Sequence, residues 1–257
     1  MSRFSNLELN SEFEESSNTE SVIKDEGYYL GEAKSAFESG RFERGLRAYA
    51  KVLEFNPRNT TAWTGQVRML IELGEFREAK LWADKALETF SNESELLAAK
   101  AVALGRLGDL KAALAFSDAS IEERGNTPYI WLARGDVLLA RKEKRAEYSF
   151  NKALLLAPND WFFPWLISRV HFFYKKFSVA LKMAQLALSV DGSRGVIWLQ
   201  LGRSQQALGL AGMAVNSFEQ VRQLDPACFE AEAELTRLSR PGLAARLRNY
   251  WRELFHR

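Results

Sequence analysis

The sequence has few of the residues from which most catalytic and metal sites are built. Its 257 residues include one cysteine, Cys228, and two histidines, His171 and His256. A single cysteine excludes an internal disulfide framework and is typical of a reducing compartment. So few histidines and cysteines cannot supply the usual zinc ligand sets, and no glycine-rich phosphate loop follows a strand-like segment. We therefore expect no metal, no cofactor and no enzymatic activity.

Long apolar runs and a strong net charge are also absent. No stretch approaches the roughly 18 consecutive apolar residues of a membrane-spanning helix, and the first residues lack the apolar core of a signal peptide. The net charge of +2 gives no general attraction to nucleic acid. These absences predict a cytoplasmic protein without a nucleic-acid partner, and they leave the oligomeric state open.

One pattern recurs along most of the chain. Large apolar residues follow one another at intervals of 34, 34, 34 and 33, and a tyrosine stands 34 residues before the first: Tyr29, Trp63, Leu97, Trp131, Trp165 and Trp198. Small residues recur beside them at Gly45, Ala79, Ala113, Ala146, Ala180 and Ala214. A period of this length indicates a repeat architecture, in which each unit buries its apolar face against the next.

The clearest copy is residues 195–228, which read W-x2-L-G-x2-Q, then A-x3-F, then P. The residues are Trp198, Leu201, Gly202, Gln205, Ala214, Phe218 and Pro226. This pattern resembles the tetratricopeptide repeat (TPR), a helix–turn–helix unit of about 34 residues; Gln205 departs from it, since the family prefers tyrosine there. The resemblance implies an all-α, right-handed superhelical solenoid of about six such repeats over residues 26–228.

The two ends of the chain differ from the repeats. Residues 1–25 are acidic and rich in serine and asparagine, which predicts a disordered tail. Alternatively, Phe4, Leu7, Leu9 and Phe13 form a short motif that folds against a partner or against the chain's own groove. Residues 229–257 are expected to form a capping helix and then a basic amphipathic helix.

That last helix has two interpretations. Leu243, Leu247, Trp251 and Leu254 form an apolar stripe, and six arginines from Arg237 onward stand against one glutamate. The stripe can dock on the last repeat and cover its apolar edge, as the terminal elements of solenoids do. The same basic helix can instead lie in an anionic membrane surface.

The resemblance also implies a concave groove lined by the first helix of each repeat. Its polar N-terminal part would contain Lys34, Arg68 and Arg106. Its apolar and aromatic C-terminal part would contain Tyr129, Leu132, Asp136, Leu139, Phe163, Leu166, Phe173, Tyr174, Leu199 and Arg203. An exposed apolar patch usually marks an interaction site. The alternative is that some of these side chains belong to the core, because periodicity does not determine which face meets solvent.

The main functional hypothesis is a non-enzymatic scaffold or adaptor that binds a partner peptide or helix in this groove. Some TPR proteins hold acidic chaperone tails with lysine, asparagine and arginine at fixed positions. This chain has Leu30, Lys34, Gly65, Glu95 and Ala99 there, which disfavours that role. Two alternatives remain: a peripheral membrane adaptor that uses the basic C-terminal helix, and a regulatory subunit of an enzyme or RNA-processing complex.

Overall fold

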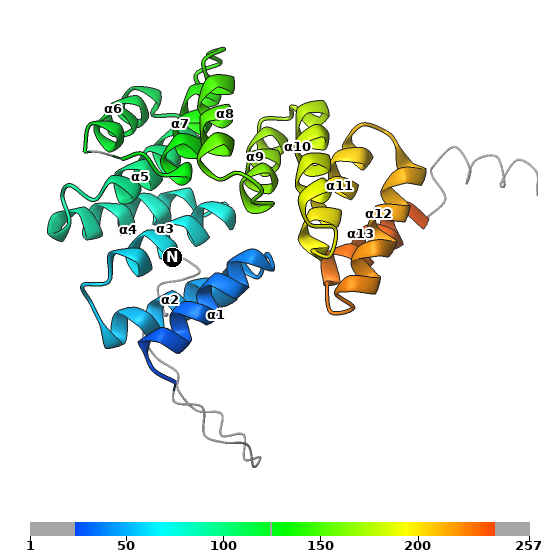
Figure 1. The fold of residues 1–257 in the computed structure, drawn as a ribbon, viewed down its shortest axis with the longest axis horizontal. Helices are drawn as coiled ribbons and strands as arrows, with labels where there is room; N and C mark the ends of the chain where they lie inside the picture. Colours follow the sequence, from blue (N-terminus) through cyan, green and yellow to red (C-terminus); the bar gives the residue numbers. More distant parts are fainter. Residues whose placement is uncertain (1–23, 124, 240–257) are drawn as a thin grey trace, which may run out of the picture. The chain divides into compact units, whose positions relative to one another are not determined.

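The computed structural model describes residues 24–123 and 125–239, and every regular element in these ranges is an α-helix (Figure 1). The thirteen helices of the described residues are α1 (Glu26–Glu38), α2 (Phe42–Phe55), α3 (Thr60–Glu72), α4 (Phe76–Thr89), α5 (Ser94–Leu107), α6 (Leu110–Glu122), α7 (Pro128–Ala140), α8 (Ala146–Leu156), α9 (Phe162–Phe173), α10 (Phe177–Val190), α11 (Gly195–Ala207), α12 (Ala211–Leu224) and α13 (Phe229–Ser239).

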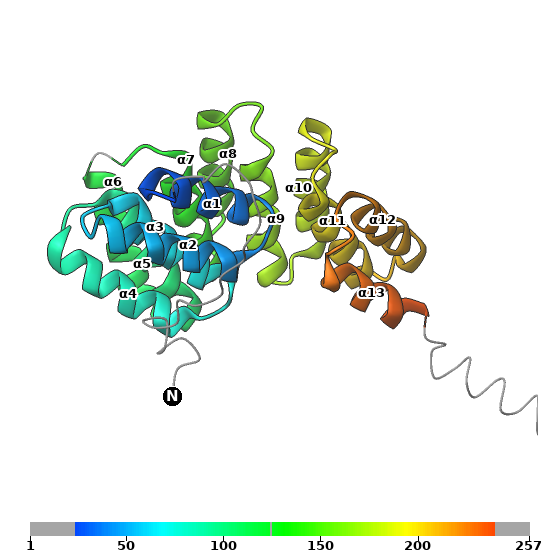
Figure 2. The same ribbon diagram turned by 90° about the horizontal axis from the view of Figure 1, so that it is seen from below.

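The helices form successive pairs, and each pair is a hairpin of a first and a second helix (Figures 1 and 2). The predicted helix–turn–helix repeats are therefore present. The chain divides into two compact units, Met1–Pro158 with α1–α8 and Asn159–Arg257 with α9–α13. The expected acidic tail lies, except for Lys24 and Asp25, outside the described residues, and so does the expected helix at 243–257. Asp25 caps α1, because its carboxylate accepts the N–H of Tyr28 at 2.9 Å.

The turn inside each pair is closed by the same backbone hydrogen bond. The N–H groups of Arg41, Glu75, Asp109, Glu143, Lys176 and Leu210 each donate to the carbonyl five residues earlier, at 2.8–3.0 Å. We call this residue the turn-closing position. The residue before it has positive φ in all six turns: Gly40, Gly74, Gly108, Lys142, Lys175 and Gly209. This arrangement satisfies the carbonyls at the end of each first helix.

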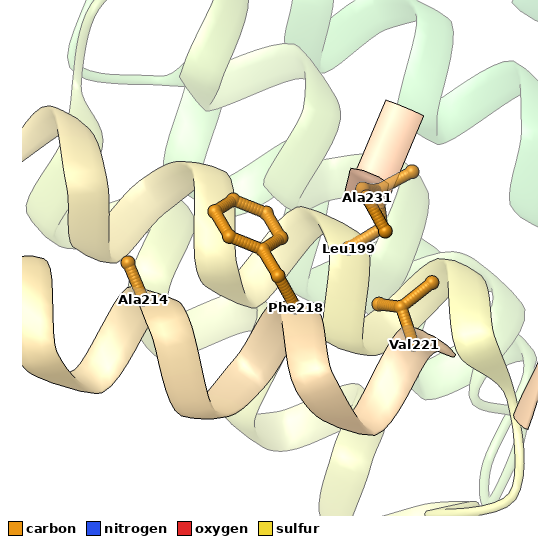
Figure 3. Packing of buried hydrophobic residues seen from close by; sticks show 5 residues of the cluster. All are labelled: Leu199, Ala214, Phe218, Val221 and Ala231. Carbon is orange, nitrogen blue, oxygen red and sulfur yellow. The ribbon is translucent and has the colours of Figure 1, made fainter. Parts of the chain in front are cut away.

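Small residues let the helices of a pair approach closely. A Cβ built on Gly202 would lie 2.6 Å from the ring of Phe218, and one on Gly135 would lie 2.4 Å from the ring of Phe150. Figure 3 shows Phe218 between Ala214 and Val221 on one face of α12, in the cluster with Leu199 and Ala231. Phe218 therefore fills the space that Gly202 leaves between the two helices of the pair.

Three of the four tryptophans at the repeat spacing make equivalent hydrogen bonds. The indole N–H groups of Trp63, Trp131 and Trp198 each donate at 2.9 Å to the loop just before their own helix. Trp165 instead donates to the carbonyl of Val196 at 3.2 Å, in the following repeat. In the preceding loop another tryptophan, Trp161, has its ring 6.0 Å from that of Trp165.

An ion pair recurs between successive repeats of the first unit. Lys100 of α5 pairs with Asp84 of α4, and Arg134 of α7 pairs with Asp118 of α6, both at 2.7 Å. Both partners are displaced by 34 residues from one pair to the next. The pairs join the second helix of one repeat to the first helix of the next, so they help to fix the register of the stack.

Candidate partner-binding surface

The first helices of unit 1 lie next to one another, with α3 against α5 and α5 against α7. They carry three of the cationic residues that the sequence predicted for the groove. Lys34 lies on α1, with 79% of its side chain exposed and its Nζ 4.0 Å from Glu38. Arg68 lies on α3 and Arg106 on α5. Of these three, only Lys34 is largely free to meet solvent.

Arg68 is held between two aromatic rings. Its guanidinium carbon lies 4.9 Å from the ring centroid of Phe37 on α1 and 3.9 Å from that of Tyr129 on α7. A guanidinium over an aromatic face is attracted by the ring quadrupole, and the attraction grows as water is excluded. Burial raises the pKa of the Tyr129 hydroxyl above its usual value, and the charge of Arg68 opposes that rise. Rings from two other first helices, α1 and α7, thus fix the cation of α3.

Arg106 and Asp136 form a buried ion pair. Arg106 Nη2 donates to Asp136 Oδ2 at 2.6 Å, and its Nε lies 3.2 Å from both carboxylate oxygens. Their side chains are 8% and 4% exposed. Because removal of one partner would leave a buried charge uncompensated, this pair contributes to the packing of α5 on α7.

The prediction of an exposed apolar groove is wrong for five side chains. Tyr129, Leu132, Leu139, Leu166 and Leu199 are all buried, as is Asp136. The 34-residue frame correctly groups them on first helices. It does not show which neighbouring side chains cover them. In the structure, Arg68 covers Tyr129, and Leu199 belongs to the Phe218 cluster. Buried side chains of this kind stabilise the repeats and do not form an open surface.

The remaining predicted residues lie in unit 2. Phe173 is 43% exposed, and its ring lies 5.0 Å from that of half-buried Tyr174. Phe163 is half-buried beside Phe162. Arg203 pairs with Glu230 of the capping helix at 3.5 Å. The structure therefore brings together Arg68 with Tyr129 and Arg106 with Asp136 in one unit, and Phe173 with Tyr174 in the other.

Several exposed apolar side chains were missed. They lie on second helices, in turns and on the capping helix: Leu81, Tyr148, Leu155, Leu208, Leu210, Met213 and Phe229. Those near Leu210 had a signal in the sequence, because the stretch 207–213, ALGLAGM, has no charged residue. A comparison of the six turns position by position distinguishes this uncharged turn from the others.

No group of three or more His, Cys, Asp or Glu side chains that could hold a metal ion is found in residues 24–123 and 125–239. In the same ranges, no helix is long and apolar enough to cross a membrane. Burial raises the pKa of the Cys228 thiol, which does not favour the reactive thiolate.

The fold is that of an α-helical repeat protein, and a comparison with protein families identifies the repeat. The family model described as tetratricopeptide repeat matches residues 5–160, more than half of the chain. The chain belongs to this family. A search of curated proteins found no match.

Solved structures with the same fold come from several sources. A TPR protein from Parabacteroides merdae is 16% identical with a TM-score of 0.54, covering 85% of this chain and 86% of its own. A thermophilic TPR protein from Thermus thermophilus is 20% identical with a TM-score of 0.54. The match covers 71% of this chain and 98% of the Thermus chain. A chain of the APC/C hetero-tetramer Cut9–Hcn1 is 15% identical with a TM-score of 0.50, and this chain spans 43% of it. At these identities the likeness shows the fold alone.

Proposed function

We propose that the chain is a non-catalytic scaffold that binds a peptide segment on the first helices of unit 1, with a carboxylate of the peptide on Arg68. TPR proteins generally serve as protein-binding scaffolds, which supports the class of function. One observation carries the proposal for the site. Arg68 Nε is buried and makes no hydrogen bond within the described part of the chain.

The surroundings of Arg68 suit an acidic ligand group. Its guanidinium is already fixed by Phe37 and Tyr129, so binding costs little side-chain entropy. A buried donor without an acceptor is costly, and a carboxylate would satisfy it with a charge-assisted hydrogen bond. Lys34 stands 34 residues earlier, at the same position of the preceding repeat, and adds a second, exposed cation.

The test is a selection of random peptides on the full chain, followed by affinity measurement with fluorescence anisotropy. We expect selected peptides to share an aspartate, a glutamate or a free C-terminal carboxylate. Arg68→Gln should weaken their binding about tenfold or more, as expected for loss of a charged hydrogen bond. The matched control is Arg47→Gln, which removes an exposed arginine of α2.

Circular dichroism of both variants separates binding from folding. The proposal fails if selected peptides lack an acidic group. It also fails if a folded Arg68→Gln protein binds them as tightly as the wild type does, or if the selection yields no binding peptide.

A further inference from the structure

The turn-closing position of the sixth repeat differs from the other five. Five repeats have a charged residue there: Arg41, Glu75, Asp109, Glu143 and Lys176. The sixth has Leu210, which makes the same backbone hydrogen bond, to Gln205, at 2.9 Å. Since the backbone N–H closes the turn, the turn does not require an apolar side chain. Leu210 is 40% exposed, so burial does not account for it either.

The whole α11–α12 turn is apolar and open. Every residue of the stretch 207–213, ALGLAGM, is exposed, and Met213 is 51% exposed. In the fifth repeat Phe177 follows the turn-closing position and packs on Phe172 at the end of the first helix, with ring centroids 5.2 Å apart. The sixth repeat has Ala211 at that position, which is too small to cover the turn in the same way.

The α9–α10 turn lies beside the α11–α12 turn. Because α10 joins α9 and α11 through short connections and packs on both, α9 and α11 run in the same direction. The indole of Trp165, near the start of α9, donates to the carbonyl of Val196, near the start of α11. The two helices therefore begin side by side, and the turns that follow them lie at one end of unit 2 (Figure 1). We call the exposed surface formed by these two turns the turn edge: Phe173, Lys175, Lys176 and residues 207–213.

The turn edge is cationic as well as apolar. Residues 161–218 contain one acidic residue, Asp191, which follows α10 at the far end of that helix and pairs with Arg194 at 2.9 Å. Within the described residues, neither Lys175 nor Lys176 pairs with an acidic side chain, and both are exposed. The arginines and lysines of the same stretch are Arg169, Lys175, Lys176, Lys182, Arg194 and Arg203. A negatively charged partner would therefore meet cations for which no acidic side chain of the turn edge competes.

This combination matches an acidic, amphipathic segment of a partner protein. Carboxylates would complement the lysines, and large apolar side chains would pack on the leucines and on Met213, whose flexible side chain adapts to different partners. A second copy of the chain is a poorer match, because a two-fold contact would bring the same lysines toward one another. An anionic lipid surface is also a poorer match, since such surfaces are usually recognised by clusters of about four to eight cations.

We propose that the turn edge binds a short segment of a partner protein in which aspartates or glutamates flank large apolar residues. Leu208, Leu210 and Met213 receive the apolar side chains of this segment. Lys175 and Lys176 pair with its carboxylates. The apolar contacts provide most of the affinity, and the lysines select an acidic sequence. Since Arg68 belongs to unit 1, the turn edge gives the scaffold a second attachment point.

The test is a selection of random peptides on the full wild-type chain, with counter-selection on the full-length Leu210→Glu, Met213→Glu variant. This variant keeps Arg68, so counter-selection removes the peptides that bind there. We expect the surviving peptides to combine acidic with large apolar residues. In fluorescence anisotropy, Lys175→Glu with Lys176→Glu should weaken their binding about tenfold or more, and salt should weaken it as well.

Matched controls change the same residue types in unit 1. Leu81→Glu with Leu155→Glu replaces two exposed leucines, and Lys111→Glu with Lys144→Glu replaces two exposed lysines. Both controls should bind the surviving peptides as the wild type does, and so should Arg68→Gln. Circular dichroism checks that every variant is folded.

The proposal is overturned if no peptide survives counter-selection or if the surviving peptides lack acidic residues. It is also overturned if the folded Lys175→Glu, Lys176→Glu variant binds them as tightly as the wild type does. Two further results would overturn it by assigning the turn edge to another occupant. One is a wild-type dimer that Leu210→Glu with Met213→Glu converts to a monomer in analytical ultracentrifugation. The other is binding to vesicles of phosphatidylcholine and phosphatidylserine that the same variant loses. None of these results depends on Arg68, so they leave the first peptide proposal untouched.

Discussion

Arg106 and Asp136 tie two first helices together: the guanidinium of α5 meets the carboxylate of α7 at 2.6 Å, and both side chains are buried. Replacing Arg106 with methionine would leave the buried carboxylate without its arginine. We expect the free energy of unfolding to fall by about 3–5 kcal/mol. Chemical denaturation followed by circular dichroism measures it.

The control for this pair is Arg134→Met, because Arg134 also pairs with an aspartate of a neighbouring helix, the partly exposed Asp118. Such a pair contributes about 0–1 kcal/mol. The double variant Arg106→Met, Asp136→Leu should recover much of the stability, since no buried charge remains. Equal losses in Arg106→Met and Arg134→Met would contradict the assignment of the first pair as buried.

Gly202→Ala should destabilise the sixth repeat by about 1–3 kcal/mol, the usual cost of overpacking a filled core. The added methyl would lie 2.6 Å from the ring of fully buried Phe218. Gly31→Ala is the matched control, because a Cβ there meets no atom within 4 Å in the interior of α1. It should raise stability by about 0.5–1 kcal/mol. Thermal unfolding of the two variants should therefore shift in opposite directions.

Lys142→Gly should stabilise the chain by about 0.5–1 kcal/mol. Lys142 has φ of 60°, in the left-handed region where a Cβ is unfavourable, while four equivalent turns have glycine. The gain is reduced by the greater freedom of glycine in the unfolded chain. Lys144→Gly in the same loop lacks the positive φ and should not stabilise. A denaturant midpoint that rises equally for both variants would refute the strain argument.

Asp191 should titrate well below an ordinary aspartate. Hydrogen bonds from the Ser193 hydroxyl at 2.6 Å, Arg194 Nε at 2.9 Å and the Ser193 N–H at 2.9 Å lower the pKa of Asp191 to about 2. Because the folded pKa is depressed, the stabilisation is present above about pH 4 and is lost as pH falls toward about 2. Carboxyl carbon shifts in NMR report this titration directly.

Removing the hydroxyl in Ser193→Ala should raise the pKa of Asp191 toward its usual value. Ser189→Ala, whose hydroxyl bonds the carbonyl of Leu186 instead, should leave that titration unchanged. If both variants titrate Asp191 at the same pH, the Ser193 hydroxyl does not hold the carboxylate.

The fold could be predicted because the repeating residue types are those that the packing and the turns require. Gly202 is small where Phe218 lies against it, and Gly40, Gly74, Gly108 and Gly209 stand where φ is positive. Such positions have a geometric requirement that few residues satisfy. Lys142 and Lys175 occupy the same left-handed position without a glycine, so the glycine signal is missing from those two turns.

The candidate site was predicted only in part. The sequence placed Arg68 and Arg106 on the groove face, but the first proved to be stacked between two rings and the second buried against Asp136. Periodicity groups residues on one helix face and says nothing of what a neighbouring repeat places over them. That is why Tyr129, Leu166 and Leu199 were expected at a surface and lie inside.

At the turn-closing position, the backbone N–H forms the turn and the side chain determines the surface chemistry. These two roles often compete at one residue, and here they are separate. The turn is closed by the backbone N–H of Arg41, Glu75 or Leu210. The side chains of these residues are a cation, an anion and an alkyl group. Any residue that keeps a backbone N–H can therefore be substituted at this position with little effect on the hairpin. Mutations at this position can change the surface chemistry of a repeat without changing its fold. New binding surfaces can therefore evolve on the same repeat architecture.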